Sequence, residues 1–370
     1  MTRLTHKGLA GIEADDTCLS LVDGTAGVLS YRGYAVEDLL DLPFESVVWL
    51  LLVGELPSDV EARAFIEWFA EIGSLSSADA ERVDTLRRAA HHPMDALQAA
   101  LPVLDRSGAD APLPDFGEHV ALRLAVRTRC VVAQLARAEA APVASSAPLH
   151  WQRFLEEIGQ CTPTEQATRA FATTQILQLD HGFNAGTFAA RVVASTRAGA
   201  PAALSAAAGA LSGVLHGGAD QAALADAREA GSPERAAAFV DACLAGGRRV
   251  MGMGHREYRV RDPRARIVHA LAREIAAGTE LEQPLGTLEA MERRFEAVMA
   301  ARGKALHANL EFYKSIVYLA CGIPEDCFTA TFAGARIFGW VAHIAEARRT
   351  GTLIRPAARW AGAEPRRRAA

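Results

Sequence analysis

The chain has 370 residues, of which 50% are hydrophobic, and a formal net charge of -5. Its length suffices for one large domain and a smaller one, and its acidic balance argues against a general nucleic-acid binder. The longest apolar run, VVWLLLV at 47–53, is too short to span a bilayer, and residues 1–18 lack the apolar core of a secretory signal. These features predict a soluble, cytoplasmic protein with no nucleic-acid or membrane partner.

The first predicted element is a short hairpin near the N-terminus. Residues 17–33, TCLSLVDGTAGVLSYRG, alternate apolar and polar residues around the turn signal DGTAG. After it, apolar residues recur three and four positions apart, which is the period of an amphipathic helix. Helices are predicted over 59–73, 119–140, 164–180, 232–246, 287–302 and 327–349.

A further helix, from about 263 to 277, begins inside an unusual motif, MGMGHREYRVRDPRA at 251–265. Asp262 suits the N-cap, and Pro263 suits the first helical position, because proline has no N–H to leave unpaired there. No alternation of strand, helix and strand is present in the sequence, which disfavours a Rossmann sheet. The sequence therefore predicts an all-α fold with one short β element near the N-terminus.

Three segments place a histidine beside glycines within otherwise apolar helical sequence. They are LDHGFNAGTF with His181, GVLHGGAD with His216, and the 251–265 motif with His255. The two glycines after His216 would let a ligand approach the backbone closely. Three histidines could instead hold zinc in a metal-dependent hydrolase, but their wide spacing matches no local metal motif. We expect no bound metal.

Three arginines stand where a guanidinium group needs a partner. Arg264 lies at the second residue of a predicted helix, where the helix dipole disfavours a cation unless an anion is near. Arg336 lies in the apolar stretch FAGARIFGW, and Arg355 precedes a proline in LIRPAARW. Carboxylates are the natural bidentate partners of such groups. With histidines to polarise carbonyls, and the carboxylate of LHANLEFYKS (306–315) to take a proton from carbon, the set suits carbon–carbon bond formation through an enol.

The chain resembles the citrate synthase family over nearly its whole length. The segments that carry this resemblance follow one another in the order GIEADDTCLSLVDGTAGVLSYRGY, FESVVWLLLVGELP, HHPMDALQAA, DHGFNAGTFAARVVAST, LHGGAD, GHREYRVRDPRA, GWVAHIAEA and LIRP. The resemblance implies an all-helical homodimer of the short bacterial type. Each chain would have a large domain, formed by residues 1–217 and 323–370, and a small domain, formed by residues 218–322.

The resemblance also implies a reaction, the condensation of acetyl-CoA with oxaloacetate to citrate and CoA, without a metal or a bound cofactor. His216 would stabilise the enol of acetyl-CoA, His255 would polarise the ketone of oxaloacetate, and Glu311 would take the proton. Arg355 would reach into the partner subunit's site. The remaining residues expected to bind oxaloacetate are His181, Asn184, Arg264 and Arg336.

Glu311 is the main departure from the family pattern, which has an aspartate as the catalytic base. Glutamate keeps a carboxylate of similar acidity but adds one methylene, and a displacement of about 1 Å at a reacting group can cost about a hundredfold in rate. Three interpretations stay open. The protein is a citrate synthase with a compensating backbone shift, a 2-methylcitrate synthase that takes propionyl-CoA, or a weakly active paralogue that acts as a sensor.

Overall fold

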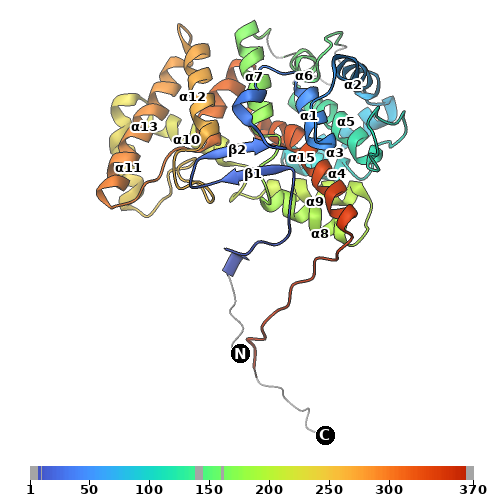
Figure 1. Ribbon diagram of the computed structural model, residues 1–370. Coiled ribbons are helices and arrows are strands. Elements are labelled where there is room, and N and C mark those ends of the chain that lie inside the picture. Colours follow the sequence, from blue (N-terminus) through green and yellow to red (C-terminus); the bar gives the residue numbers. More distant parts are fainter. Residues whose placement is uncertain (1–6, 10, 138–144, 160–161, 364–370) are drawn as a thin grey trace.

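The computed structural model describes residues 7–9, 11–137, 145–159 and 162–363. This part of the chain is helical except for one small sheet, which confirms the all-α prediction (Figure 1). None of the helices in these ranges is long and apolar enough to cross a membrane.

The α-helices are distributed over the whole described chain. Those before residue 217 are α1 (Phe44–Val53), α2 (Asp59–Ile72), α3 (Ser77–Ala89), α4 (Pro93–Ala100), α5 (His119–Ala136), α6 (His150–Ile158), α7 (Glu165–Leu177), α8 (Ala185–Ser195) and α9 (Ala200–Leu211). Those after it are α10 (Ala219–Ala230), α11 (Pro233–Ala245), α12 (Pro263–Ala276), α13 (Glu282–Ala301), α14 (Leu310–Ala320) and α15 (Phe328–Thr350). Short 3-10 turns are present at Lys7–Leu9, Val36–Leu39 and Glu325–Cys327.

Each helix predicted from the sequence is present, with its ends displaced by a few residues. The helix expected from residue 263 is α12, and its N-cap is Asp262, whose carboxylate accepts from the backbone N–H of Arg264 at 3.0 Å. α7 ends a few residues earlier than predicted, since the N–H of Leu179 turns back to the carbonyl of Ile176 at 3.2 Å and the N–H of Asp180 donates to the hydroxyl of Tyr31 at 3.3 Å. The predicted last residues of α5, 138–140, lie outside the described part.

The predicted N-terminal hairpin is confirmed, and it carries one further short strand. β1 (Ser20–Asp23) pairs antiparallel with β2 (Val28–Tyr31), which pairs with β3 (Tyr34–Ala35). The carboxylate of Asp23 closes the turn between β1 and β2 by accepting from the backbone N–H groups of Thr25 and Ala26, both at 2.8 Å. The turn signal in the sequence therefore acts through its aspartate side chain.

The hairpin lies against the first and third histidine segments and holds both. At one end, the hydroxyl of Ser20 donates to the carboxylate of Asp180 at 2.5 Å. At the turn, the carbonyl of Gly24 accepts from the N–H of Arg259 at 2.7 Å. Only glycine fits at position 24, because an added Cβ would lie 2.0 Å from a carbonyl oxygen of the same facing segment. The hairpin thus fixes two segments that are far apart in the sequence.

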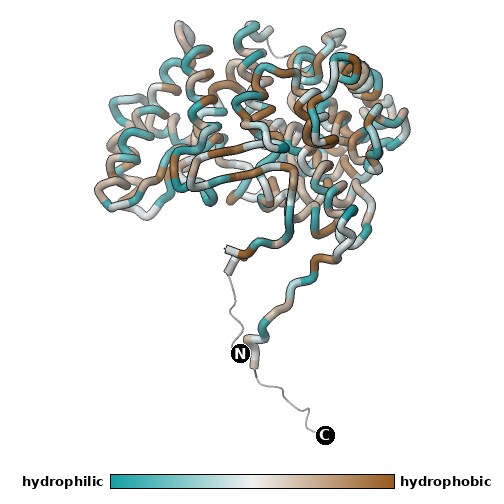
Figure 2. The backbone as a smooth tube through the Cα atoms, viewed as in Figure 1, coloured by the Kyte–Doolittle hydropathy of each residue, from teal (hydrophilic) through white to brown (hydrophobic). Residues whose placement is uncertain are grey.

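α15 is the central helix of the core, and most of its residues are buried. It packs against α5, α8 and α9. Figure 2 shows that the helices of the body carry both hydrophobic and hydrophilic residues. Burial of a large apolar side chain contributes about 1.5–3 kcal/mol to the free energy of folding. A charged residue in the middle of this helix is therefore unusual, and Arg336, with 2% of its surface exposed, is one.

The helices α10–α13 gather on one side of the molecule and α1–α6 on the other, with α7 and the hairpin between them (Figure 1). The expected division into a large domain of residues 1–217 and 323–370 and a small domain of residues 218–322 stays a prediction. Beyond α15, residues 351–363 run away from the body (Figure 1).

Candidate active site

The glycines of the 251–265 motif bring it against the segment that precedes α14. A short antiparallel bridge joins the two segments, and the N–H of Asn309 donates to the carbonyl of Gly252 at 2.9 Å. Gly252 has a φ of +75°, and an added Cβ would lie 2.8 Å from a ring carbon of Phe312, so the close approach requires glycine. The turn therefore sets the distance between His255 and Glu311, which follow these contacts on the two segments.

The ring of His255 is held in one tautomer by its own turn. Nδ1 accepts from the backbone N–H groups of Glu257 at 3.0 Å and Tyr258 at 3.2 Å, so in the neutral ring the proton lies on Nε2. Burial, together with the neighbouring Arg264, lowers the pKa of His255. At pH 7 the ring is therefore neutral and presents a single N–H donor.

Arg264 directs its guanidinium group toward the same Nε2 atom. Its Nε and one Nη donate to the two carboxylate oxygens of Asp262 at 3.0 and 2.8 Å, so Asp262, expected only as an N-cap, also supplies the anion that this helix start requires. The same Nη lies 3.4 Å from Nε2 of His255. Both atoms carry hydrogen, so neither accepts from the other. They are two donors that face one space, where a carbonyl or carboxylate oxygen would accept from both.

Arg336 is a buried cation without an ion-pair partner among the described residues. Its Nε donates to the carbonyl of Gln178 at 2.5 Å, and its guanidinium carbon lies 4.7 Å from the centre of the Phe332 ring. Burial lowers the pKa of Arg336 to about 10, the charge of Asp180 opposes this change and that of Arg264 adds to it, so the group stays charged at pH 7. A buried charge without a partner is costly, by several kcal/mol or so, and a substrate carboxylate would offset that cost.

His181 lies beside these groups, as the sequence predicts. Its ring stands edge-on to that of His255, with 5.2 Å between the ring centres, and its Nε2 lies 3.2 Å from the hydroxyl of Tyr258. The side chain is buried. Burial, followed by the charge of Arg264, lowers the pKa of His181 well below its usual value. The site thus holds a second neutral imidazole.

His216 lies in the loop after α9 and is half-buried. Its Nε2 lies 3.3 Å from Oδ1 of Asn184, which also caps α8 by accepting from the N–H of Thr187 at 3.1 Å. The Asn184 carboxamide is therefore engaged within the protein, and its contact with a substrate stays a prediction. Burial, together with Arg336, lowers the pKa of His216 to about 4, so this ring too is neutral at pH 7.

Glu311, in the first turn of α14, brings a carboxylate to the same region. Its charge opposes the lowering of the pKa of His216 and of His255, and it interacts with Arg264 and Arg336 as well. Since such interactions weaken with distance, the carboxylate lies within electrostatic reach of all four. It is half-buried and accepts no hydrogen bond from the described residues. A carboxylate in this state can take a proton from a substrate.

Arg355 lies apart from the other predicted site residues. It is exposed in the extended segment after α15, where its Nη donates to the carbonyl of Pro356 at 3.4 Å. Its role at the partner subunit's site therefore stays a prediction. No group of three or more His, Cys, Asp or Glu side chains that could hold a metal ion is found in the described part of the chain.

Sequence reasoning missed several buried polar residues next to the site. Lys314 and Asp220 form an ion pair with 3.1 Å between Nζ and Oδ2, and neither side chain is exposed. Gln178, whose carbonyl holds Arg336, lies inside a predicted helix, where the sequence does not distinguish it from its neighbours. A signal for the pair was present, because Lys314 interrupts the apolar helix LEFYKSIVYLA and Asp220 follows the two glycines after His216.

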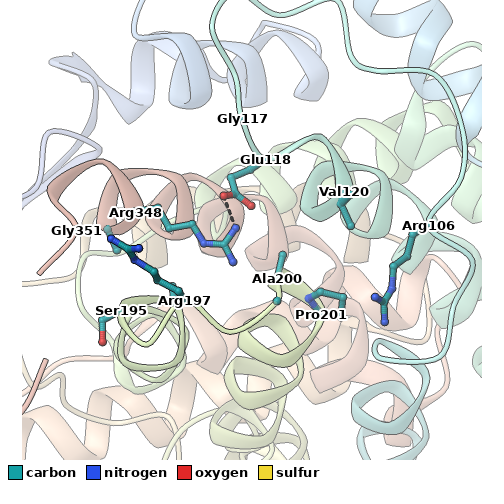
Figure 3. Close-up of a pocket in the computed structure, with 13 residues that line it drawn as sticks. Arg106, Gly117, Glu118, Val120, Ser195, Arg197, Ala200, Pro201, Arg348 and Gly351 are labelled. Atoms are coloured by element: carbon teal, nitrogen blue, oxygen red, sulfur yellow. Dashed lines mark hydrogen bonds and ion pairs between the residues drawn. The ribbon is translucent and has the colours of Figure 1, made fainter. Parts of the chain in front are cut away.

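A hollow of about 600 Å³ lies elsewhere, between the start of α5, the end of α8, the start of α9 and the end of α15. Arg106, Arg197 and Arg348 line it, and Arg348 turns toward Glu118, with which it forms an ion pair (Figure 3). None of the candidate catalytic residues borders this hollow, so it is separate from the site.

Neutral imidazoles, two buried guanidinium groups and a free carboxylate on an all-helical scaffold suit an enzyme that forms carbon–carbon bonds. Comparison with known proteins leads to the same class. The citrate synthase C-terminal domain family matches residues 8–357. The chain therefore belongs to the citrate synthase family and is a condensing acyltransferase.

Individual relatives agree with this assignment. The chain is 35% identical to a citrate synthase of Synechocystis sp., over 95% of this chain and 89% of that one. It is 34% identical to 2-methylcitrate synthase 1 of Corynebacterium glutamicum, over 98% and 96%. The citrate synthase of Thermoplasma acidophilum, solved as a ternary complex with carboxymethyl coenzyme A and oxaloacetate, is 28% identical, with a TM-score of 0.89 and coverage of 100% and 99%.

Replacing Gly252 with alanine tests whether the turn sets the geometry of the site. The left-handed backbone costs alanine about 1–2 kcal/mol, and the new methyl group would press on Phe312, the residue after Glu311. We expect a loss of unfolding free energy of this size and, for a displacement of about 1 Å, a fall in kcat of about a hundredfold. Thermal unfolding and steady-state turnover measure the two effects.

Gly247→Ala is the matched control, because Gly247 has a φ of +71° and open space where its Cβ would lie. This variant should lose similar stability and keep its turnover. Equal turnover in the two variants would show that the Gly252 turn does not position the site.

Proposed function

We propose that the protein condenses acetyl-CoA with oxaloacetate to give citrate and CoA, with CoA arriving as part of a substrate rather than as a bound cofactor. The observation that carries the proposal is Arg336, a buried guanidinium group without an ion-pair partner in the described part of the chain, beside Arg264. Two cations within electrostatic reach of each other suit a dicarboxylate. The ternary complex of the Thermoplasma acidophilum relative supports the choice of oxaloacetate and a CoA thioester.

Oxaloacetate binds through its two carboxylates. The Nη groups of Arg336 are free of ion pairs within the described residues, so they take one carboxylate in the bidentate manner that suits guanidinium. Arg264 is already joined to Asp262 through Nε and one Nη. Its remaining N–H donors take the second carboxylate, and the substrate thereby offsets the repulsion between the two arginines.

The ketone of oxaloacetate is polarised by His255. Nδ1 is occupied by two backbone N–H groups, so Nε2–H is the donor that remains. A neutral imidazole polarises the ketone through a hydrogen bond to its oxygen. The ring itself carries no positive charge that would have to be removed later in the reaction. Arg264, whose Nη lies 3.4 Å from this Nε2, stabilises the same oxygen as it becomes negative.

Glu311 starts the reaction on the acyl side. Its carboxylate takes a proton from the methyl group of acetyl-CoA, and the electrons of the broken C–H bond form the C=C bond of an enol. The thioester oxygen gains electron density and accepts from Nε2–H of His216, which gives up its contact with Asn184. The C=C electrons of the enol then form the bond between its methylene carbon and the ketone carbon, and the C=O electrons move onto the ketone oxygen, which takes the proton of His255 Nε2–H to become a hydroxyl. The proton held by Glu311 leaves to water, and water returns a proton to His255. Water finally cleaves the thioester, and this hydrolysis pulls the condensation forward.

The functional unit of the proposal is a homodimer. Arg355 stands in an exposed, extended segment that leaves the body of its own chain. A guanidinium group in that position can reach the site of a second copy, where it would contact a substrate carboxylate. Dimer formation would then be required for activity.

2-Methylcitrate synthesis from propionyl-CoA is the second candidate, and the 34% identity to 2-methylcitrate synthase 1 of Corynebacterium glutamicum favours it. One methyl group separates the two substrates and is worth only about 1–3 kcal/mol of discrimination. We favour acetyl-CoA, because the longer side chain of Glu311 takes up room on the acyl side of the site. The sensor interpretation requires that Glu311 fail as a base.

Replacing His255 with alanine removes the donor to the ketone. Loss of one such donor costs about a hundred- to a thousandfold in kcat. The ring also accepts from two backbone N–H groups of its own turn, so its loss should lower the melting temperature slightly. We expect turnover to fall by at least this factor in a variant that stays folded, measured by thiol release and by thermal unfolding. His91→Ala, at an exposed residue outside the site, should behave as wild type. Near-normal turnover of the His255 variant would contradict the mechanism.

Replacing Glu311 with aspartate distinguishes the three interpretations. Thiol release is measured with acetyl-CoA and with propionyl-CoA, each with oxaloacetate, for wild type and Glu311→Asp. If the site is built around glutamate, the aspartate variant is slower by about a hundredfold, because its carboxylate is withdrawn by about 1 Å, and wild type prefers acetyl-CoA. A wild type that is inactive on both thioesters, together with an active aspartate variant, would overturn the proposal in favour of the sensor.

A further inference from the structure

A buried ion pair lies directly behind the candidate active site. The ammonium of Lys314 lies 3.1 Å from the carboxylate of Asp220, and both side chains are completely buried. Lys314 is one of three lysines among the 39 lysines and arginines of the chain. A lysine at this position is therefore unusual in a chain that otherwise uses arginine. Burial disfavours the charge, yet the Asp220 carboxylate more than offsets this and the pKa of Lys314 is raised. The lysine is thus charged, and it is too deeply buried to touch a substrate.

The pair joins the two segments that carry the acyl-side chemistry. Asp220 lies in the first turn of α10, one turn beyond His216. Lys314 lies one turn after Glu311 on α14, and residues three apart share a face of a helix. The contact between Lys314 and Asp220 therefore joins α14, which carries Glu311, to the start of α10, which follows His216 directly in the chain.

Lys314 also contacts the supports of the oxaloacetate side. Its Nζ lies 3.4 Å from the side-chain oxygen of Gln178, whose backbone carbonyl holds Arg336. Nζ also lies 4.2 Å from the centre of the Phe332 ring, over which the guanidinium of Arg336 is placed at 4.7 Å. One ammonium group on the helix of Glu311 thus contacts α10, which follows the loop of His216, and α15, which carries Arg336.

Such a pair is poorly suited to stabilise the fold, because the cost of burying two charges commonly equals or exceeds their attraction. What a buried ion pair can provide is register, since each charge is stabilised only where its partner lies. The Lys314 ammonium lies within electrostatic reach of Glu311 as well, so a change in its place would be felt at the base. The pair therefore contributes to the site by fixing the positions of its neighbours rather than by adding to the stability of the fold.

We propose that Lys314 and Asp220 are positioning residues of the condensation reaction, which hold the helix of Glu311 and the segment of His216 at the separation that proton transfer and enol stabilisation require. This inference rests on the proposed function. A positioning role differs from a structural role in one respect. A structural pair can be replaced by a neutral pair of similar volume without loss of rate, whereas a positioning pair cannot.

The test compares Lys314→Met, Asp220→Asn and the double variant with wild type. Each single variant leaves one buried charge without its partner, so both should have lower melting temperatures and lower rates. The double variant has no buried charge and should melt at or above the temperature of the single variants. We expect its kcat for acetyl-CoA and oxaloacetate to stay about a hundredfold below wild type, because the two segments are free to shift by about 1 Å. KM for oxaloacetate should change little, since Arg336 is held by the backbone carbonyl of Gln178.

The matched control is the exposed pair of Arg294 and Asp241, which joins α11 and α13 at 2.8 Å away from the site. Removal of both its charges should leave kcat unchanged. A Lys314→Met/Asp220→Asn variant that folds and turns over at the wild-type rate would overturn the proposal and make the pair structural.

Should the double variant fail to fold, Asp220→Glu replaces it as the test. This variant keeps the charges and lengthens one arm by a methylene, so kcat should fall while KM for oxaloacetate stays near the wild-type value. An unchanged kcat would overturn the proposal. A wild type without turnover on either thioester would instead refute the proposed function itself, so the two failures are distinguishable.

Discussion

A buried positive charge without an ion-pair partner among the described residues is the constraint on which this structure depends. Arg336 lies in the middle of α15, a helix buried along most of its length, where one backbone carbonyl and an aromatic ring hold it and the carboxylate of Asp180 acts on it only at longer range. A fold selected for stability alone would place an apolar residue there. Its retention is understandable if a ligand supplies an anion. Under the proposed function a dicarboxylate substrate supplies it, between Arg336, Arg264 and the neutral imidazoles, and the surrounding elements hold these groups in place.

Short-range contacts of the backbone keep these groups in place. The N-terminal hairpin touches both the segment of His181 and the segment after His255, and the turn at Gly252 ties the latter to the start of α14. Segments that are far apart in the sequence and carry histidines of the site thus come together through the small sheet and through turns. Backbone groups at glycines and the side chains of Ser20 and Asp180 make these contacts, so the histidines and arginines of the site are left free for the substrate. Burial, followed by the charge of Arg336, lowers the pKa of His216 to about 4, and this keeps the imidazole neutral, as a donor to an enol requires.

The sequence predicted those features that depend on neighbours along the chain. Helical periodicity located the helices, Asp262 and Pro263 marked the start of α12, and glycines beside histidines pointed to the segments of the site. It did not predict the bidentate contact of Asp262 with Arg264, the contact of Asn184 with His216, or the buried pair of Lys314 and Asp220. The last two join residues that are far apart in the sequence, and no local pattern fixes the distance between them. The first requires a side-chain conformation that the N-cap signal alone does not specify. The domain boundaries and the place of Arg355 stay predictions, because they depend on a second chain or on closure of the site.

Titration of oxaloacetate into wild type and Arg336→Gln, followed by calorimetry, tests the central claim most directly. Hydrogen bonds to charged groups are worth about 1.5–3 kcal/mol each, so the account predicts that the variant binds oxaloacetate at least tenfold more weakly, or about a hundredfold if both Nη groups are used. It also predicts a melting temperature at or above that of wild type, because the uncompensated charge is gone. Equal affinity in the two proteins, or a variant that is both weaker in binding and less stable, would contradict the claim that Arg336 is kept for the ligand.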